Sequence, residues 1–392
     1  MTGAHFPAEP GPATAIAAPD TQRLAHAALA YIAEPADPVM TALSRSWTPA
    51  EVIALLRAGG VPGGPWPGLD RRLPRWLTRL REAPTEATLD SWHRAGIRLV
   101  IPSDPEWPTQ LDSLGAARPW ALWVRGHGDL RYACLRSVSV VGTRAATAYG
   151  NHVCADITVT LAERGWTVVS GGAYGIDACA HRSALAAGGS TVAVLACGAD
   201  VTYPRGHEEL FDRIVGRGVV VSEWPPGRLP TKRGFLTRNR VIAALSRGTV
   251  VVEAASRSGA LNTARHARDQ NRPLMAVPGP VTSSQSAGCH EIIRNWGAIC
   301  VTSAADVVEV LAFADDEPMR EGRHPLLPLD QLDLETSQVL SVVPGRTGRG
   351  PASIAAAAGV GLDTVMRCLG LLASAGFIER CPQGWRKRRE SQ

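Results

Sequence analysis

The sequence contains no uninterrupted apolar run long enough to cross a lipid bilayer, although 45% of its 392 residues are hydrophobic. Its charged fraction of 20% is typical of soluble globular proteins. Residues 1–20 are rich in Ala, Pro and Gly but lack the basic leader and apolar stretch of a secretory signal. We therefore interpret residues 1–20 as a disordered tail and expect a cytoplasmic protein.

The cysteines show neither a metal-binding nor a disulfide pattern. The chain has 8 Cys, scattered from Cys134 to Cys381, and no two of them form a Cys-x-x-Cys pair. Structural zinc sites and disulfide frameworks usually have regular spacing. We expect reduced thiols, no metal and no cofactor.

Three motifs of nucleotide-binding and hydrolytic enzymes are missing. No Gly-x-Gly-x-x-Gly follows the first predicted strand, and no Gly-Lys-Ser/Thr of a P-loop occurs. A Gly-x-Ser-x-Gly nucleophile elbow is also absent. These absences argue against NAD binding, ATP hydrolysis and serine hydrolysis. We interpret His181, on the helix expected after Asp177, as a packed or capping residue rather than a general base.

Charge is concentrated locally. The net charge of +5 is too small to indicate nucleic-acid binding by itself. Basic residues cluster at 228–240 and 386–389, whereas acidic residues gather at 315–321. The acidic stretch and its neighbouring prolines predict a solvated linker over residues 312–328.

Helical and strand patterns divide the chain. Residues 21–97 have a helical pattern, in which Thr48 and Pro49 are typical of an N-cap and a first helical position. From residue 138 onward, helical stretches alternate with short β-branched runs at 138–141, 167–169, 191–195, 219–221, 249–252 and 274–277. Continuous apolar strands separated by helices predict a Rossmann-like, doubly wound parallel sheet in an α/β domain of residues 98–311.

The end of the chain has a different pattern. Residues 329–386 are expected to contain three helices, followed by two short strands at 377–379 and 384–385. Three helices and a hairpin in this order are typical of a winged helix. Since winged helices also mediate protein contacts, the pattern indicates a fold more strongly than a function.

Small and charged residues follow the first two predicted strands. Gly142, Thr143 and Arg144 follow the first strand, and Ser170-Gly171-Gly172 follows the second. Ligands bind outside the carboxyl ends of parallel strands, where glycine lets the backbone approach them closely. An Arg side chain can hold a phosphate with two hydrogen bonds. Together the two segments predict an anion site, although each alone is compatible with an ordinary strand-to-helix turn.

Residues 225–240 are predicted to form a basic loop around one aromatic side chain. The loop surrounds Phe235 with five cations, Arg228, Lys232, Arg233, Arg238 and Arg240. Cations that follow phosphates and a ring that stacks under a base are typical of single-stranded nucleic-acid binding. The alternative interpretation places Phe235 in the core and the cations in solvent.

The α/β segment resembles the DprA/Smf family of DNA-processing proteins over roughly residues 98–311. The matching stretches are Gly142-Thr-Arg144, Tyr149-Gly150, Ser170 to Asp177, Ala180-His181, Cys197-Gly198, Tyr203-Pro204, Ser222-Glu223, Phe235 to Arg240, Glu253-Ala254, Ser258-Gly259 and Ala276 to Gly279. The chain departs from the usual family pattern at Trp224, Leu236 and Cys289-His290. A long ordered series of this kind is more specific than any single motif.

The resemblance implies a non-enzymatic protein that binds single-stranded DNA, protects it and loads the RecA recombinase during natural transformation and homologous recombination. It implies a DNA pocket lined by Arg144, Ser170, Gly171, Gly172, Lys232 and Phe235. The segment Arg238-Asn239-Arg240 is implied to support that loop or to contact its phosphates. Residues 21–97 are implied to be a SAM-like domain, and family members form homodimers through the late α/β region.

Two other functions are kept as alternatives. A nucleotide phosphoribohydrolase-like enzyme on the same scaffold would use Glu253 as its acid, but the Pro-Gly-Gly-x-Gly-Thr motif expected before that residue is absent. A transcriptional regulator would bind duplex DNA through the winged helix. For the dimer, we expect an apolar patch around His290 to Trp296, where Ile292, Ile293 and Trp296 have helical spacing.

Overall fold

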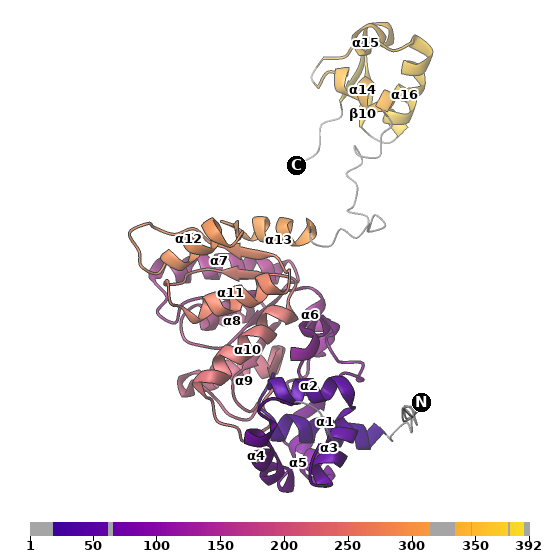
Figure 1. Cartoon of the computed structure of the whole chain (residues 1–392). Coiled ribbons are helices and arrows are strands. Elements are labelled where there is room, and N and C mark those ends of the chain that lie inside the picture. Colours follow the sequence, from indigo (N-terminus) through magenta and orange to yellow (C-terminus); the bar gives the residue numbers. More distant parts are fainter. Residues whose placement is uncertain (1–18, 62–65, 314–333, 346, 375–376, 388–392) are drawn as a thin grey trace, which may run out of the picture. The chain divides into compact units, whose positions relative to one another are not determined.

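Apolar, β-branched runs form the strands of one mixed sheet. A computed structural model describes residues 19–61, 66–313, 334–345, 347–374 and 377–387 (Figure 1). The chain divides into two units, Met1–Asp316 and Glu317–Gln392. The sheet lies in the first unit.

The sheet has nine strands in the order β1-β2-β6-β5-β4-β3-β7-β8-β9. Strands β3 to β9 pair in parallel, whereas β2 is antiparallel to both β1 and β6. The strands are β1 (Ile97–Val100), β2 (Leu122–Arg125), β3 (Ser137–Val141), β4 (Thr167–Ser170), β5 (Thr191–Leu195), β6 (Val219–Ser222), β7 (Thr249–Val251), β8 (Leu274–Ala276) and β9 (Ile299–Cys300).

All six expected strands are present, and the expectation of a mostly parallel sheet in a mixed α/β fold is confirmed. The sheet is not parallel throughout, because two strands that were not predicted, β1 and β2, form an antiparallel edge. These two strands are joined by the 3-10 segment η1 (Thr109–Ala117) and have no crossover helix between them. Antiparallel neighbours need no such crossover, so the alternation of strands and helices did not reveal them.

Helices cover both faces of the sheet. One face packs against α7 (Ala148–Glu163), α8 (Ile176–Ala186), α9 (Glu208–Arg217) and α13 (Ala304–Phe313). The other face packs against α10 (Lys232–Leu245), α11 (Gly259–Asp269), α12 (Ala287–Asn295) and the short α6 (Leu130–Leu135). Val140 faces the first layer and Val141 the second, and both side chains are buried. Burial on both faces explains why the strand sequences are continuously apolar.

Among the residues that the structure describes, five helices precede the sheet (indigo to purple in Figure 1). They are α1 (Pro19–Ile32), α2 (Pro38–Ser46), α3 (Pro49–Arg57), α4 (Leu69–Arg81) and α5 (Glu86–Arg94). Thr48 and Glu51 form a capping box at α3, as the Thr48-Pro49 pattern predicts. Helix α1 also packs Ala27 and Ala30 against Trp123 of β2. Because the helices and the sheet share a core, the boundary between residues 21–97 and 98–311 remains a prediction.

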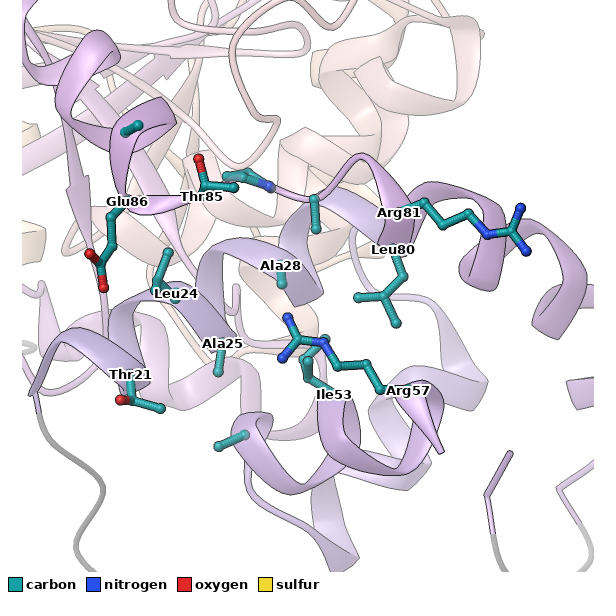
Figure 2. A pocket seen from close by; sticks show the side chains of 14 residues that line it. Thr21, Leu24, Ala25, Ala28, Ile53, Arg57, Leu80, Arg81, Thr85 and Glu86 are labelled. Carbon is teal, nitrogen blue, oxygen red and sulfur yellow. The ribbon is translucent and has the colours of Figure 1, made fainter. Parts of the chain in front are cut away.

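A cavity of about 600 Å³ lies among these helices (Figure 2). Apolar side chains such as Leu24, Ile53 and Leu80 line it, and its charged residues are Arg57, Arg81 and Glu86. With two cations, one anion and a mostly apolar wall, this cavity lacks the concentration of positive charge expected of a nucleic-acid site.

The described part of the second unit contains three helices and a hairpin. These are α14 (Leu334–Val342), α15 (Pro351–Ala358), α16 (Leu362–Ser374), and the antiparallel pair β10 (Ile378–Cys381) and β11 (Gly384–Lys387). The winged helix remains an interpretation of these elements. Among the described helices, none is individually long and apolar enough to cross a membrane, and only α15 with most of α16, bent by 107°, passes that test as a pair.

Three expectations fall wholly or partly on residues outside the described part of the chain. The tail predicted for residues 1–20 lies there except for its last two residues, which belong to α1. Most of the linker predicted for residues 312–328 and the end of the basic cluster at 386–389 lie there too.

The buried His181 gives a prediction on stability. Its Nδ1 lies 2.7 Å from Thr191 Oγ1, and the Thr191 hydroxyl donates to Val168 O, so the imidazole donates and stays neutral. Burial and the nearby His207 lower the pKa of His181 to about 3. The unfolded chain therefore takes up a proton near pH 6.5 that the folded chain does not bind.

We expect the free energy of unfolding to fall as the pH drops below 6.5, by up to about 1.4 kcal/mol per pH unit from His181 alone. In His181→Asn, whose amide can still donate to Thr191, that part of the slope should vanish between pH 6.5 and 4. Urea unfolding at several pH values measures it. Identical slopes for the two proteins would contradict a neutral, buried His181.

Candidate nucleic-acid interface

A cleft opens where the strand order reverses. Strand β3 lies between β4 and β7, so successive strands run outward from β3 in both directions. The segments after β3 and β7 border a cleft of about 660 Å³, which both Gly142 and Ser258 line. Such a switch point is where open α/β sheets bind ligands.

The turn after β3 supplies the first wall of the cleft. A Cβ on Gly142 would lie 2.5 Å from Ile176 Cγ1 and 2.9 Å from Glu253 O, so only glycine fits. The Thr143 backbone N–H donates to Glu253 O at 2.7 Å, which fixes the turn. The next residue, Arg144, is exposed and lines the cleft.

Phe235 and Arg144 meet in the cleft. The Arg144 guanidinium carbon lies 5.1 Å from the centre of the Phe235 ring, within the range of a cation–π contact. Arg238 approaches the ring to 5.9 Å and Tyr203 to 5.6 Å, the latter at an angle of 50°. Phe235 is half-buried and neighbouring Leu236 is exposed, so this apolar surface remains partly open.

The expectation of a loop over residues 225–240 is wrong for its second half, because α10 begins at Lys232. Thr231 accepts a hydrogen bond from the Gly234 backbone N–H at 3.0 Å and is the N-cap. The first turn carries Lys232, whose side chain is exposed and lines the cleft. The start of α11 also lies there, with Ser258 as its N-cap. Two positive helix ends therefore open toward the cleft.

Arg238 and Asn239 line the cleft but act mainly as a brace. Arg238 is buried, and its Nη1 donates to Gly171 O at 2.7 Å and to Val194 O. Asn239 Nδ2 donates to Gly259 O and Asn262 Oδ1, at 3.3 and 3.1 Å. These bonds connect α10 to the ends of β4 and β5 and to α11. Burial lowers the pKa of Arg238 to about 10, so it stays charged at neutral pH.

Two other cations of the basic segment point elsewhere. Arg240 is buried in an ion pair of 2.5 Å with the buried Glu223. Arg228 donates to Tyr31 O at 3.0 Å and lies 5.4 Å from the centre of the Tyr31 ring. Neither lines the cleft.

Ser170, Gly171 and Gly172 lie behind the cleft and do not line it. The Ser170 hydroxyl donates to Val140 O at 2.7 Å. A Cβ on Gly171 would lie 2.6 Å from the Arg238 guanidinium, so this glycine makes room for the brace. The structure therefore brings together Gly142, Thr143, Arg144, Lys232, Phe235, Arg238 and Asn239. It leaves Ser170, Gly171, Gly172 and Arg240 outside, and DNA contact by any of the eleven remains a prediction.

Two residues that line the cleft were not predicted to contact DNA. Arg257 is exposed and lines the cleft after β7, and Tyr203 contributes a second, exposed ring. The Ser258-Gly259 pair after a predicted strand indicated a turn near Arg257. Only the strand order shows that this turn lies opposite Gly142. Tyr203 precedes a proline outside any strand, so its position had no periodic signal.

Glu253, the acid of the alternative enzyme, is already engaged. Its carboxylate accepts hydrogen bonds from the Thr147 backbone N–H at 2.9 Å and the Thr147 hydroxyl at 2.7 Å. The side chain is 1% exposed and does not line the cleft. This geometry suits a residue that fixes the start of α7 rather than one that protonates a substrate.

Comparison with known proteins agrees with this architecture. Residues 98–312 match the model of a family described as DNA recombination-mediator protein A. A putative DNA processing protein DprA of Mycobacterium tuberculosis (strain ATCC 25618 / H37Rv) is 44% identical over 383 residues, covering 94% of this chain and 95% of the relative. Protein Smf of Escherichia coli (strain K12) is 37% identical over 329 residues, covering 82% and 85%.

A solved structure shows the same fold. The X-ray structure of DNA processing protein A (DprA) from Streptococcus pneumoniae aligns with a TM-score of 0.60 and 29% sequence identity. The alignment covers 74% of this chain and 97% of that chain. It confirms the mixed α/β architecture around a mostly parallel sheet.

The contrast between Arg238 and Lys232 gives a prediction. Arg238→Leu leaves buried carbonyl groups of Gly171 and Val194 unpaired and removes the cation near Asp177, so the free energy of unfolding should fall by about 3 kcal/mol. Lys232→Ala changes an exposed side chain and should change the free energy of unfolding by less than about 0.5 kcal/mol. Urea unfolding compares both with the parent. Equal stability of all three proteins would refute the bracing role of Arg238.

Proposed function

The chain belongs to the DNA recombination-mediator protein A family, and on that premise we propose that it binds single-stranded DNA in the switch-point cleft and passes it to the RecA recombinase. The observation that carries this proposal is the Phe235 ring, half-buried beside Arg144 in a cleft bordered by two helix N-termini. An aromatic face between cations suits a base and its flanking phosphates.

Each part of the cleft has a chemical role in this proposal. Arg144, Lys232 and Arg257 are exposed cations that can neutralise phosphates, and the N–H groups at the starts of α10 and α11 add to the positive field. Phe235 and Tyr203 offer stacking surfaces. None of these contacts reads the hydrogen-bonding edge of a base, so binding should tolerate any sequence.

The proposal assigns no catalytic step to the chain. The acid required by the phosphoribohydrolase alternative is buried against Thr147 and lies outside the cleft. Gel shifts with single-stranded DNA, duplex DNA and free nucleotides distinguish the functions. Preference for free nucleotides favours the enzyme, and duplex binding by the second unit favours a regulator.

The remaining parts of the proposal concern domains and partners. We interpret the first helices as a SAM-like domain and the second unit as a winged helix, in a cytoplasmic protein that acts in natural transformation and homologous recombination. The proposed dimer patch needs one revision, because Ile292 is buried in its own core. Ile293 and Trp296 are only partly buried, and Ile299 on the edge strand β9 is 48% exposed. These three residues are the better candidates.

The cleft predicts different binding defects for different side chains. Arg144→Ala or Lys232→Ala should weaken binding of any single strand and reduce the salt slope by about 0.7, because each removes one phosphate contact. Phe235→Ala should cost about 1–3 kcal/mol with little change in salt slope, whereas Phe235→Tyr should retain much of the affinity. Fluorescence anisotropy with labelled oligothymidylate over a salt series measures both quantities.

Arg217→Ala is the matched control, since it removes an exposed cation at the end of α9, remote from the carboxyl ends of the strands. Circular dichroism must show each variant folded. If the folded Arg144, Lys232 and Phe235 variants all bind like the parent, the cleft is not the DNA site and the enzyme alternative reopens.

The revised patch predicts a dimer that one charge disrupts. The parent should sediment as a dimer at micromolar concentration and Ile299→Asp as a monomer, because a carboxylate on the edge strand opposes apolar contact and strand pairing. Leu229→Asp places the same charge at a position that is 74% exposed in the segment between β6 and α10, and should leave the mass unchanged. A monomeric parent would refute the proposed dimer.

A further inference from the structure

Helix α4 presents an unusual density of arginines. Five of its 13 residues are Arg, and Asp70 is its only acid. Arg71, Arg75 and Arg79 follow one another at intervals of four residues, and Arg72 lies between them, so the four share one side of the helix. Arg81 falls outside this series and lines the cavity of Figure 2.

These arginines face a second hollow, which we call the α4 hollow. It has a volume of about 320 Å³ and combines residues from α4, the α1–α2 region and α10. Its lining residues are Glu34, Asp37, Arg71, Arg72, Arg75, Trp76, Arg79 and Arg233. The hollow therefore contains five arginines and two carboxylates.

The two carboxylates do not neutralise this charge. Asp37 pairs with Arg72 at 2.7 Å, and Glu34 accepts from both Arg75 at 2.8 Å and Arg79 at 3.1 Å. Arg71 and Arg233 are exposed, and in the described part of the chain no carboxylate lies within ion-pair distance of either. Burial, followed by repulsion from Arg228 and Arg75, lowers the pKa of Arg79. The local surplus of positive charge favours an anion.

Consecutive residues of α10 line the switch-point cleft and the α4 hollow. Lys232 lines the cleft, and Arg233, the next residue, lines the hollow. Consecutive Cα atoms are about 3.8 Å apart, so the two sets of lining residues adjoin at the first turn of α10. A strand that leaves the cleft past Lys232 can therefore reach Arg233 and the hollow.

We propose that the α4 hollow holds the phosphodiester backbone of the strand beyond the cleft, so that the N-terminal helices lengthen the single-stranded DNA site. This inference rests on the proposed function of the cleft. Among the described residues that line the hollow, Trp76 is the only aromatic one and is 2% exposed, so these residues offer cations but no open aromatic face. Contact there should depend on phosphates and not on bases.

The test uses the full chain and labelled oligonucleotides: a thymidylate hexamer, a thymidylate 25-mer and two partly abasic 25-mers. Each partly abasic 25-mer keeps its bases only in one terminal hexamer, at the 5′ end in one and at the 3′ end in the other. The Arg71→Ala/Arg233→Ala double variant should bind the 25-mer about tenfold more weakly, since each exposed cation contributes a few-fold. Its salt slope should fall by about 1.4. Its affinity for the hexamer should equal that of the parent.

For the parent, at least one abasic 25-mer should bind nearly as tightly as the complete 25-mer. Arg57→Ala/Arg81→Ala is the control, because it also removes two positive charges, but from α3 and α4 at the cavity of Figure 2. It should leave all affinities unchanged.

If the folded Arg71→Ala/Arg233→Ala variant binds the 25-mer as tightly as the parent, the proposal is overturned. An acidic protein segment would then be the remaining candidate occupant of the α4 hollow. Equal weakening of hexamer and 25-mer would also overturn it, by assigning both arginines to the cleft. Failure of the proposed function is distinct, because an Arg144→Ala/Phe235→Ala variant would then bind the hexamer like the parent.

Discussion

The reversal of strand order between β3 and β7 is the constraint on which the proposed site depends. The chain leaves β3 toward α7 on one face and leaves β7 toward α11 on the other, so the two connections diverge and leave a crevice. Backbone turns at Gly142 and Ser258 border that crevice, and α10 presents its first turn there. The positive charges can gather around an open space because the topology creates it.

Burial divides the basic segment 228–240 into separate roles. Arg238 and Arg240 are buried and bond to carbonyl and carboxylate oxygens respectively, so they hold α10 in place. Arg228 is engaged with Tyr31 of the N-terminal helices. Lys232 and Arg233 remain exposed at the start of α10. Charge density along a sequence therefore overstates the charge available to a ligand, since a buried guanidinium must have its partners within the protein.

The sequence predicts the centre of the fold better than its edges. Strands buried on both faces give continuous apolar runs, which is why β3 to β8 were expected and β1, β2 and β9 were missed. Strand ends and interleaved cations are local signals that pointed to Gly142, Arg144 and Phe235 separately, whereas a shared pocket for Arg144 and Phe235 was implied by the resemblance to the DprA/Smf family. The contact between Arg144 and Phe235 joins segments far apart in sequence, and Arg257 enters only through the strand order. No local pattern encodes such placements.

The distribution of aromatic rings has a consequence for how a strand would be presented. Phe235 and Tyr203 offer stacking surfaces only in the cleft, whereas the proposed path along α4 has cations and a buried Trp76. The bases of a strand held there through its phosphates would not stack on the protein and would remain exposed to solvent. In the proposed function, pairing with a second strand would require free base edges, and a recombinase would need access to the strand. A path along α4 that contacts the phosphates rather than the bases would meet both requirements.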